Sequence, residues 1–139
     1  MKRKIISLLL MVITLIFFTA CGGGTVECSL VGVEETRVVI LVKQTDGKGT
    51  LLDCMEYLAE KEDTFAYEMV GGMLTEINGK ANAADFSGCW MLYTSDDEMS
   101  NTEWGVIEYE GATLGSAVVG AEVLLVEEGE IYVWIYQTF

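Results

Sequence analysis

One stretch of this chain has the period of an amphipathic helix, and it lies between segments with the composition of strands. Its apolar stripe at helical spacing consists of Leu51, Cys54, Met55 and Leu58. Thr50 can cap the free amide groups at the start, and Asp53 favours the positive N-terminal end of a helix. We therefore expect one helix of about three turns, long enough to cover a sheet face.

Short apolar runs on either side of this helix predict the strands. Arg37–Lys43, before the helix, is a β-branched run typical of a strand buried on both faces. The strands expected after it are Phe65–Met69, Met73–Asn78 (beyond the Gly71-Gly72 break and before the Asn78-Gly79 turn), Trp90–Tyr93, Val123–Val126 and Ile131–Tyr136. The last two are expected to pair as a terminal hairpin, with Ile131, Val133 and Ile135 on one face and Tyr132, Trp134 and Tyr136 on the other. This order predicts an α+β fold, mostly antiparallel sheet with the helix packed on one face.

The N-terminal residues have the layout of a secretory signal. The basic head Lys2–Lys4 precedes an apolar stretch, Ile5–Phe18, that is too short for a comfortable membrane span of about 20 residues. The segment that ends in Ala20 and Cys21 resembles a bacterial lipoprotein box. We expect a lipoprotein signal peptide over residues 1–20 and a tether over residues 21–35. Acyl chains such as palmitate on Cys21 would hold the protein on the extracytoplasmic face of the bacterial cell membrane. The alternatives are a plain signal peptide or a one-pass anchor.

The charge of the expected mature chain excludes polyanionic partners. Residues 21–139 keep all 22 acidic residues and five basic ones, a net charge of −17. Such a surface repels phosphate backbones and anionic lipid headgroups. Nucleic acid is therefore not expected as a partner, and membrane attachment depends on the lipid.

Nothing in the sequence predicts catalysis or a metal site. The chain has no histidine, which removes mechanisms that need an imidazole base and the common zinc sites. The carboxylate pairs Asp96/Asp97 and Glu127/Glu128 are typical of a solvated surface rather than of acid–base chemistry. We expect a protein that is not an enzyme and requires no cofactor.

Three cysteines remain after Cys21, so at most one internal disulfide can form. An exported chain permits a disulfide, but the spacing of Cys28, Cys54 and Cys89 does not tell which pair forms it. Small buried hydrophobes are the simpler interpretation of Cys54 and Cys89.

Several motifs in this order resemble the transcobalamin-like C-terminal domain family. They are the helix Gly49–Leu58, the Phe65/Tyr67 strand, the strand and turn Gly72–Gly79, the strand Trp90–Tyr93, the segment Gly105–Tyr109 and the closing segment Glu127–Trp134. Glu130 departs from the family, which usually has aspartate there, and so does the spacing around Gly111–Gly120. The resemblance implies a β-grasp-like domain over residues 36–139.

The resemblance also implies a ligand, because this domain closes over one side of cobalamin in the animal carriers. The implied corrinoid-binding residues are Gly71, Gly72, Met73, Leu74, Trp90, Met91, Leu92 and Tyr93. In the simpler alternative, alternate members of Trp90–Tyr93 fill the core and only the outward pair could meet a ligand. The chain lacks the carriers' large helical domain, so we expect an accessory to uptake. A dimer, a membrane transporter or a second subunit would cover the other side of the ligand. The alternative function is a non-catalytic surface module for protein interaction or adhesion.

Overall fold

The computed structural model describes residues 24–139 of the chain. The predicted signal peptide over residues 1–20 and the lipid site at Cys21 lie outside the described residues. No helix in the described part of the chain is both long and apolar enough to cross a membrane.

Six antiparallel strands form the main sheet, in the order β1-β2-β9-β6-β8-β7. Their bounds are Val26–Glu34 (β1), Arg37–Thr45 (β2), Gly88–Thr94 (β6), Ser100–Tyr109 (β7), Ala112–Ala117 (β8) and Ile131–Thr138 (β9). The helix α2 (Leu51–Lys61) precedes a small antiparallel sheet of β3 (Tyr67–Val70), β4 (Met73–Ile77) and β5 (Lys80–Ala81). A short 3-10 helix, η1 (Asp97–Met99), joins β6 to β7. The structure thus confirms the expected α+β architecture.

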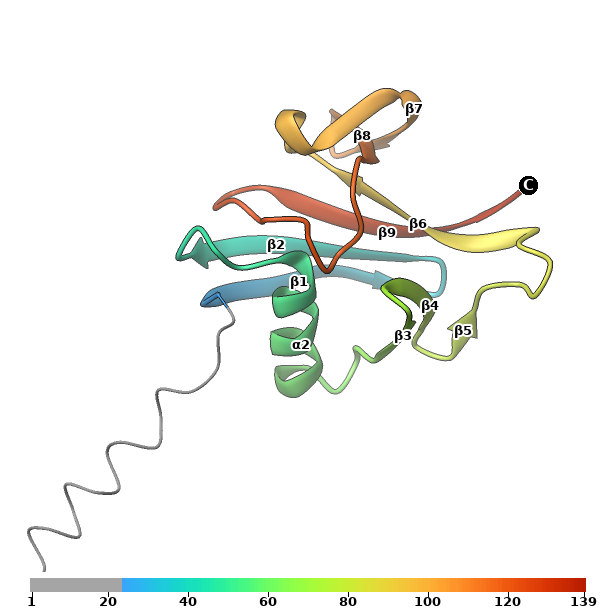
Figure 1. The fold of residues 1–139 in the computed structure, drawn as a ribbon, viewed down its shortest axis with the longest axis horizontal. Helices are drawn as coiled ribbons and strands as arrows, with labels where there is room; N and C mark the ends of the chain where they lie inside the picture. Colours follow the sequence, from blue (N-terminus) through green and yellow to red (C-terminus); the bar gives the residue numbers. More distant parts are fainter. Residues whose placement is uncertain (1–23) are drawn as a thin grey trace, which may run out of the picture.

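One face of the main sheet carries both the helix and the small sheet. Figure 1 shows α2 and β3–β5 on the same side of the long strands, with the β7–β8 hairpin at the opposite end of the sheet. The helix-side core contains the whole predicted stripe of α2 together with Ile40 of β2, Leu74 of β4 and Trp90 of β6. A smaller cluster around Val39, Leu114 and Val133 lies on the other face. The expected alternation of β9 is confirmed, since its aromatic face joins the first cluster and its aliphatic face the second.

The helix cap at Thr50 and the turn at Asn78-Gly79, both predicted from the sequence, are present in the structure. Thr50 caps α2, because its hydroxyl oxygen accepts from the Asp53 amide at 3.2 Å and the Asp53 carboxylate accepts from the Thr50 amide at 2.8 Å. Asn78 and Gly79 both have positive φ, 49° and 83°, which is the backbone of a tight hairpin turn between β4 and β5.

The prediction of a tether over residues 21–35 is wrong for its second half, because Val26–Glu34 forms β1. This strand pairs with β2 from Val26↔Thr45 to Glu34↔Arg37. Two register shifts interrupt the ladder, at Glu27/Cys28 and at Leu30/Gly32. Such shifts disturb the alternation of apolar residues by which a strand is recognised. The folded part therefore begins well before residue 36.

The prediction of a terminal hairpin is also wrong. β9 pairs with β2 and β6, whereas Val123–Val126 forms no strand and makes one isolated bridge, Thr50↔Leu125. The reason lies at the start of α2, where free amide groups need acceptors. Leu51 N–H donates to the Leu124 carbonyl at 2.9 Å, and Leu52 N–H donates to the Ala121 carbonyl at 3.0 Å. Leu124 and Val126 of this segment are buried in the helix-side core, whereas Val123 and Leu125 are exposed.

Candidate ligand-binding pocket

A pocket of about 400 Å³ opens between the small sheet and the main sheet. Its walls come from the end of β3, the start of β4, strand β6, residues 116–121 (the end of β8 and the segment after it), and Trp134 of β9. β8 pairs with β6 only at Tyr93 and Thr94. Along the preceding part of β6, the pocket therefore takes the place of a neighbouring strand on that side. Segments far apart in the sequence therefore meet at one edge of β6.

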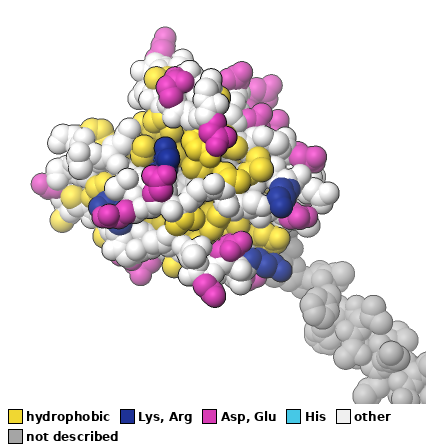
Figure 2. All heavy atoms as spheres, turned by 180° about the vertical axis from the view of Figure 1, so that it is seen from behind, with side chains coloured by type: hydrophobic (Ala, Val, Ile, Leu, Met, Phe, Trp, Pro, Cys, Tyr) yellow, Lys and Arg dark blue, Asp and Glu magenta, His cyan; other side chains and the backbone are white. Residues whose placement is uncertain are grey.

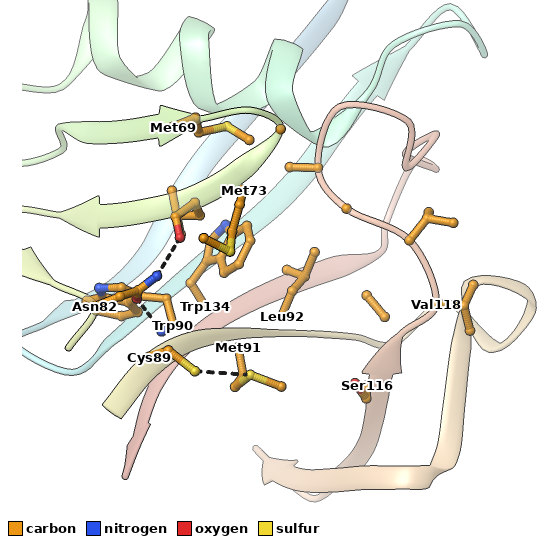
Figure 3. Close-up of a pocket in the computed structure, with 16 residues that line it drawn as sticks. Met69, Met73, Asn82, Cys89, Trp90, Met91, Leu92, Ser116, Val118 and Trp134 are labelled. Carbon is orange, nitrogen blue, oxygen red and sulfur yellow. Dashed lines mark hydrogen bonds between the residues drawn. The ribbon is translucent and has the colours of Figure 1, made fainter. Parts of the chain in front are cut away.

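Six of the eight residues predicted to bind a ligand line this pocket. They are Gly72, Met73, Leu74, Trp90, Met91 and Leu92. Gly71 does not line it; it lies in the preceding turn, where its positive φ of 58° suits glycine. Tyr93 lies in the core cluster on the far face of the sheet, and its hydroxyl is 3.0 Å from Gln137 Oε1, to which it donates. Figure 3 shows Met91 and Leu92 on opposite sides of β6, with Met73 and Trp134 on the Leu92 side.

Asn82 joins the two sheets beneath the pocket. Its Nδ2 donates to the Leu74 carbonyl at 2.8 Å, and its Oδ1 accepts from the Trp90 amide at 2.9 Å (Figure 3). The side-chain amide therefore bridges β4 and β6. Sequence reasoning missed this residue, although a lone amide among small residues after the Asn78-Gly79 turn was a usable signal.

Trp90 supports the pocket wall more than it faces a ligand. Its side chain is buried, its indole N–H donates to the Lys80 carbonyl at 2.7 Å, and its ring packs edge-on against Tyr136 at 5.6 Å between centroids. Its hydrogen-bonding capacity is thus used within the protein. This agrees with the core-filling alternative for this position.

Trp134 differs from Trp90 in the hydrogen bonding of its indole N–H. Its side chain is 6% exposed and lines the pocket, yet its indole N–H has no hydrogen-bond partner among the described residues. An unpaired buried donor costs on the order of 1–3 kcal/mol. From the sequence, the aromatic face of β9 (Tyr132, Trp134 and Tyr136) is a rival ligand site, although covering a helix or sheet is the commoner use of such a face. Trp134 therefore supplies the pocket with an unused donor.

The pocket carries no charge of its own, since every residue of the described chain that lines it is neutral. The carboxylate of Glu122 borders the pocket beside Gly72. It lies so close that a Cβ atom added at Gly72 would be 2.7 Å from Glu122 Oε2. Gly72 also has a positive φ of 81°, so a larger residue there would be strained as well as crowded. The site suits a neutral or weakly cationic ligand with a large apolar surface.

In residues 24–139, no three His, Cys, Asp or Glu side chains gather in a way that could hold a metal ion. Asp96, expected on a solvated surface, is buried; its Oδ1 accepts from the Glu98 amide at 3.0 Å and caps η1. Cys89 Sγ lies 3.7 Å from Met91 Sδ on the outer side of β6.

Comparisons with protein-family models, with curated proteins and with solved structures found no match to this chain. The proposed function therefore depends on the sequence motifs and on the geometry of the pocket.

Proposed function

We propose that this chain is a lipid-anchored extracytoplasmic protein that binds a corrinoid, such as cobalamin, and assists its uptake. The proposal includes a β-grasp-like fold similar to the small C-terminal domain of cobalamin carriers, and attachment to the membrane through Cys21. The ordered motifs from Gly49 to Trp134 support it. The neutral pocket at the edge of β6 supports it independently of them.

The observation that carries the proposal is the unpartnered N–H of Trp134 inside an uncharged pocket. A ligand that brings a carbonyl oxygen to this donor would remove the cost of leaving it unpaired. A corrin ring is a wide, largely apolar disc fringed with amides, so it offers such carbonyls beside apolar surface. The side chains of Met73 and Leu92 would contact the ring edge.

The size of the pocket limits what this domain can do alone. A pocket of about 400 Å³ lies within the range of small-molecule sites, but a whole corrinoid is too large to enter it. The pocket would hold one edge of the ring, and a membrane transporter, a second subunit or a second copy would cover the rest. Because the chain has no histidine, it offers no imidazole to the cobalt, and the corrinoid would keep its own axial base.

A matched pair of tryptophan variants tests the proposal. Trp134→Phe removes the N–H and keeps an aromatic ring, whereas Trp104→Phe makes the same change on the surface of β7, where Trp104 is 64% exposed and outside the pocket. Cobalamin binding to the full chain in detergent would be followed by corrin absorbance. We expect Trp134→Phe to weaken binding by roughly 2- to 10-fold, the value of one hydrogen bond, and Trp104→Phe to leave it unchanged. Equal affinities of the two variants would contradict the role of Trp134.

A protein-interaction or adhesion module is the second candidate, and one observation favours it. Figure 2 shows apolar side chains gathered across the face of the molecule seen from behind the view of Figure 1. A shallow hollow on β1, β2, the β7–β8 hairpin and β9 is lined by Val31, Leu41, Tyr109, Glu110, Ala112 and Ile131. Exposed apolar patches of this kind mark interaction sites. Under this function, Leu41→Glu would abolish binding to a surface partner, whereas Trp134→Phe would not change it.

A further inference from the structure

Two of the described cysteines lie together between the helix and the edge strand of the main sheet. Cys28 is on β1, Cys54 is near the start of α2, and both belong to the helix-side core. They are 6% and 0% exposed, respectively. The helix packs against β1, and Cys28 is the neighbour that does most to raise the pKa of the Cys54 thiol. Two buried cysteines that are neighbours on elements held together by packing are in the arrangement that a disulfide requires.

We propose that Cys28 and Cys54 form a disulfide bond when the folded chain meets an oxidising compartment. The bond would fasten α2 to β1, which has a sheet partner on one side only. Of the three described cysteines, it would leave Cys89 as the free thiol, at the rim of the pocket. Disulfides persist outside the cytoplasmic membrane, where the N-terminal sequence is expected to direct the chain. The proposal does not depend on the ligand.

The chemistry requires an organic disulfide as oxidant, either an oxidised thiol–disulfide oxidoreductase in the cell or oxidised glutathione in a tube. One protein thiol loses its proton, and its sulfur displaces one sulfur of the oxidant. This step forms a mixed disulfide and releases one thiol. The second protein sulfur then attacks the protein side of the mixed disulfide, which closes the Cys28–Cys54 bond and releases a second thiol. The two electrons and two protons lost by the protein are thereby found on the two released thiols.

Cys28 is the expected site of the first step. It lies on an edge strand, and a register shift next to it interrupts the ladder with β2, so local opening of β1 exposes its sulfur. Cys54 is fully buried, and the neighbouring Cys28 thiol together with burial raises the pKa of its thiol. It is therefore the poorer initial nucleophile and is suited to the closing step.

A peptide map of the full chain tests the proposal directly. The reduced protein in detergent would be treated with oxidised glutathione, its remaining thiols alkylated, and the protein digested without reduction. Mass spectrometry would then assign each cysteine separately. We expect one linked pair of peptides, containing Cys28 and Cys54, and an alkylated Cys89.

The stability of the oxidised and reduced wild-type proteins gives a second measurement that needs no variant. The disulfide closes the loop from Cys28 to Cys54, and closing a loop of this length should raise the thermal midpoint by roughly 10 °C. Cys89→Ser should keep both the link and the shift, and Cys28→Ser should lose both. Alkylation of both Cys28 and Cys54 after oxidation, or a bond from either one to Cys89, would overturn the proposal.

Discussion

Replacing Leu124 by alanine should destabilise the protein far more than the same change at its neighbour Leu125. Leu124 is fully buried in the helix-side core, whereas Leu125 is 49% exposed. Leu→Ala in a well-packed core costs about 2–5 kcal/mol, because it removes buried methyl groups and leaves a cavity. We expect a loss of about 3 kcal/mol in the free energy of unfolding for Leu124→Ala. For Leu125→Ala we expect a loss of less than about 1 kcal/mol.

Urea denaturation followed by circular dichroism measures both changes. With a slope of about 1.5 kcal/mol per molar urea, the midpoint should fall by about 2 M for Leu124→Ala, with the slope unchanged. A domain of this size has a total stability of only about 5–15 kcal/mol, so the difference between the variants is easily resolved. If Val123–Val126 were a hairpin strand with its other face buried, Leu125→Ala would be the damaging variant. Equal midpoints, or a larger fall for Leu125→Ala, would refute the placement of this segment at the start of α2.

Three further changes test local features of the structure. Thr50→Ala should lower the free energy of unfolding by about 1 kcal/mol, because its hydroxyl oxygen accepts a free amide of α2 at 3.2 Å; an unchanged urea midpoint would contradict this. In the reduced native protein, Cys89 should react with a thiol reagent before Cys28 and Cys54, which are buried; equal rates before unfolding would contradict their burial. Backbone amides that donate to Asp46 lower the pKa of its carboxyl below 3.8, so its stabilising contribution is present above that value and lost as pH falls through the lowered pKa. Asp46→Asn should therefore flatten the acid side of a plot of thermal midpoint against pH, and a profile identical to wild type would argue against this role.

The elements that the sequence predicted correctly have signals contained within a few residues. The cap and stripe of α2 and the Asn78-Gly79 turn require no knowledge of a distant partner. β2 was recognisable because both of its faces are covered, so its residues form one continuous apolar run.

Two of the missed features, β1 and the placement of Val123–Val126, depend on distant partners, whereas the β7–β8 hairpin, which was also missed, is local. β1 is interrupted by two register shifts, so its apolar residues do not alternate regularly. Val123–Val126 has the composition of a strand, but its Leu124 carbonyl accepts from the Leu51 amide of α2, some seventy positions earlier in the chain. At the pocket, the motifs located β4 and β6, whereas Trp134 entered the site through the pairing of β9 with β6. The absence of a partner for its N–H is a property of three-dimensional packing that no local pattern carries.

Hydrogen–deuterium exchange of the full chain with and without cobalamin tests the central claim most directly, because it reports both binding and its location. If the pocket holds the edge of the corrin ring, amide exchange should slow at residues 72–74, 90–92 and 116–121 and stay the same in β1 and β7. Unchanged exchange throughout the chain at about 1 mM cobalamin, or slowing confined to the open face of the sheet, would contradict a corrinoid site in this pocket.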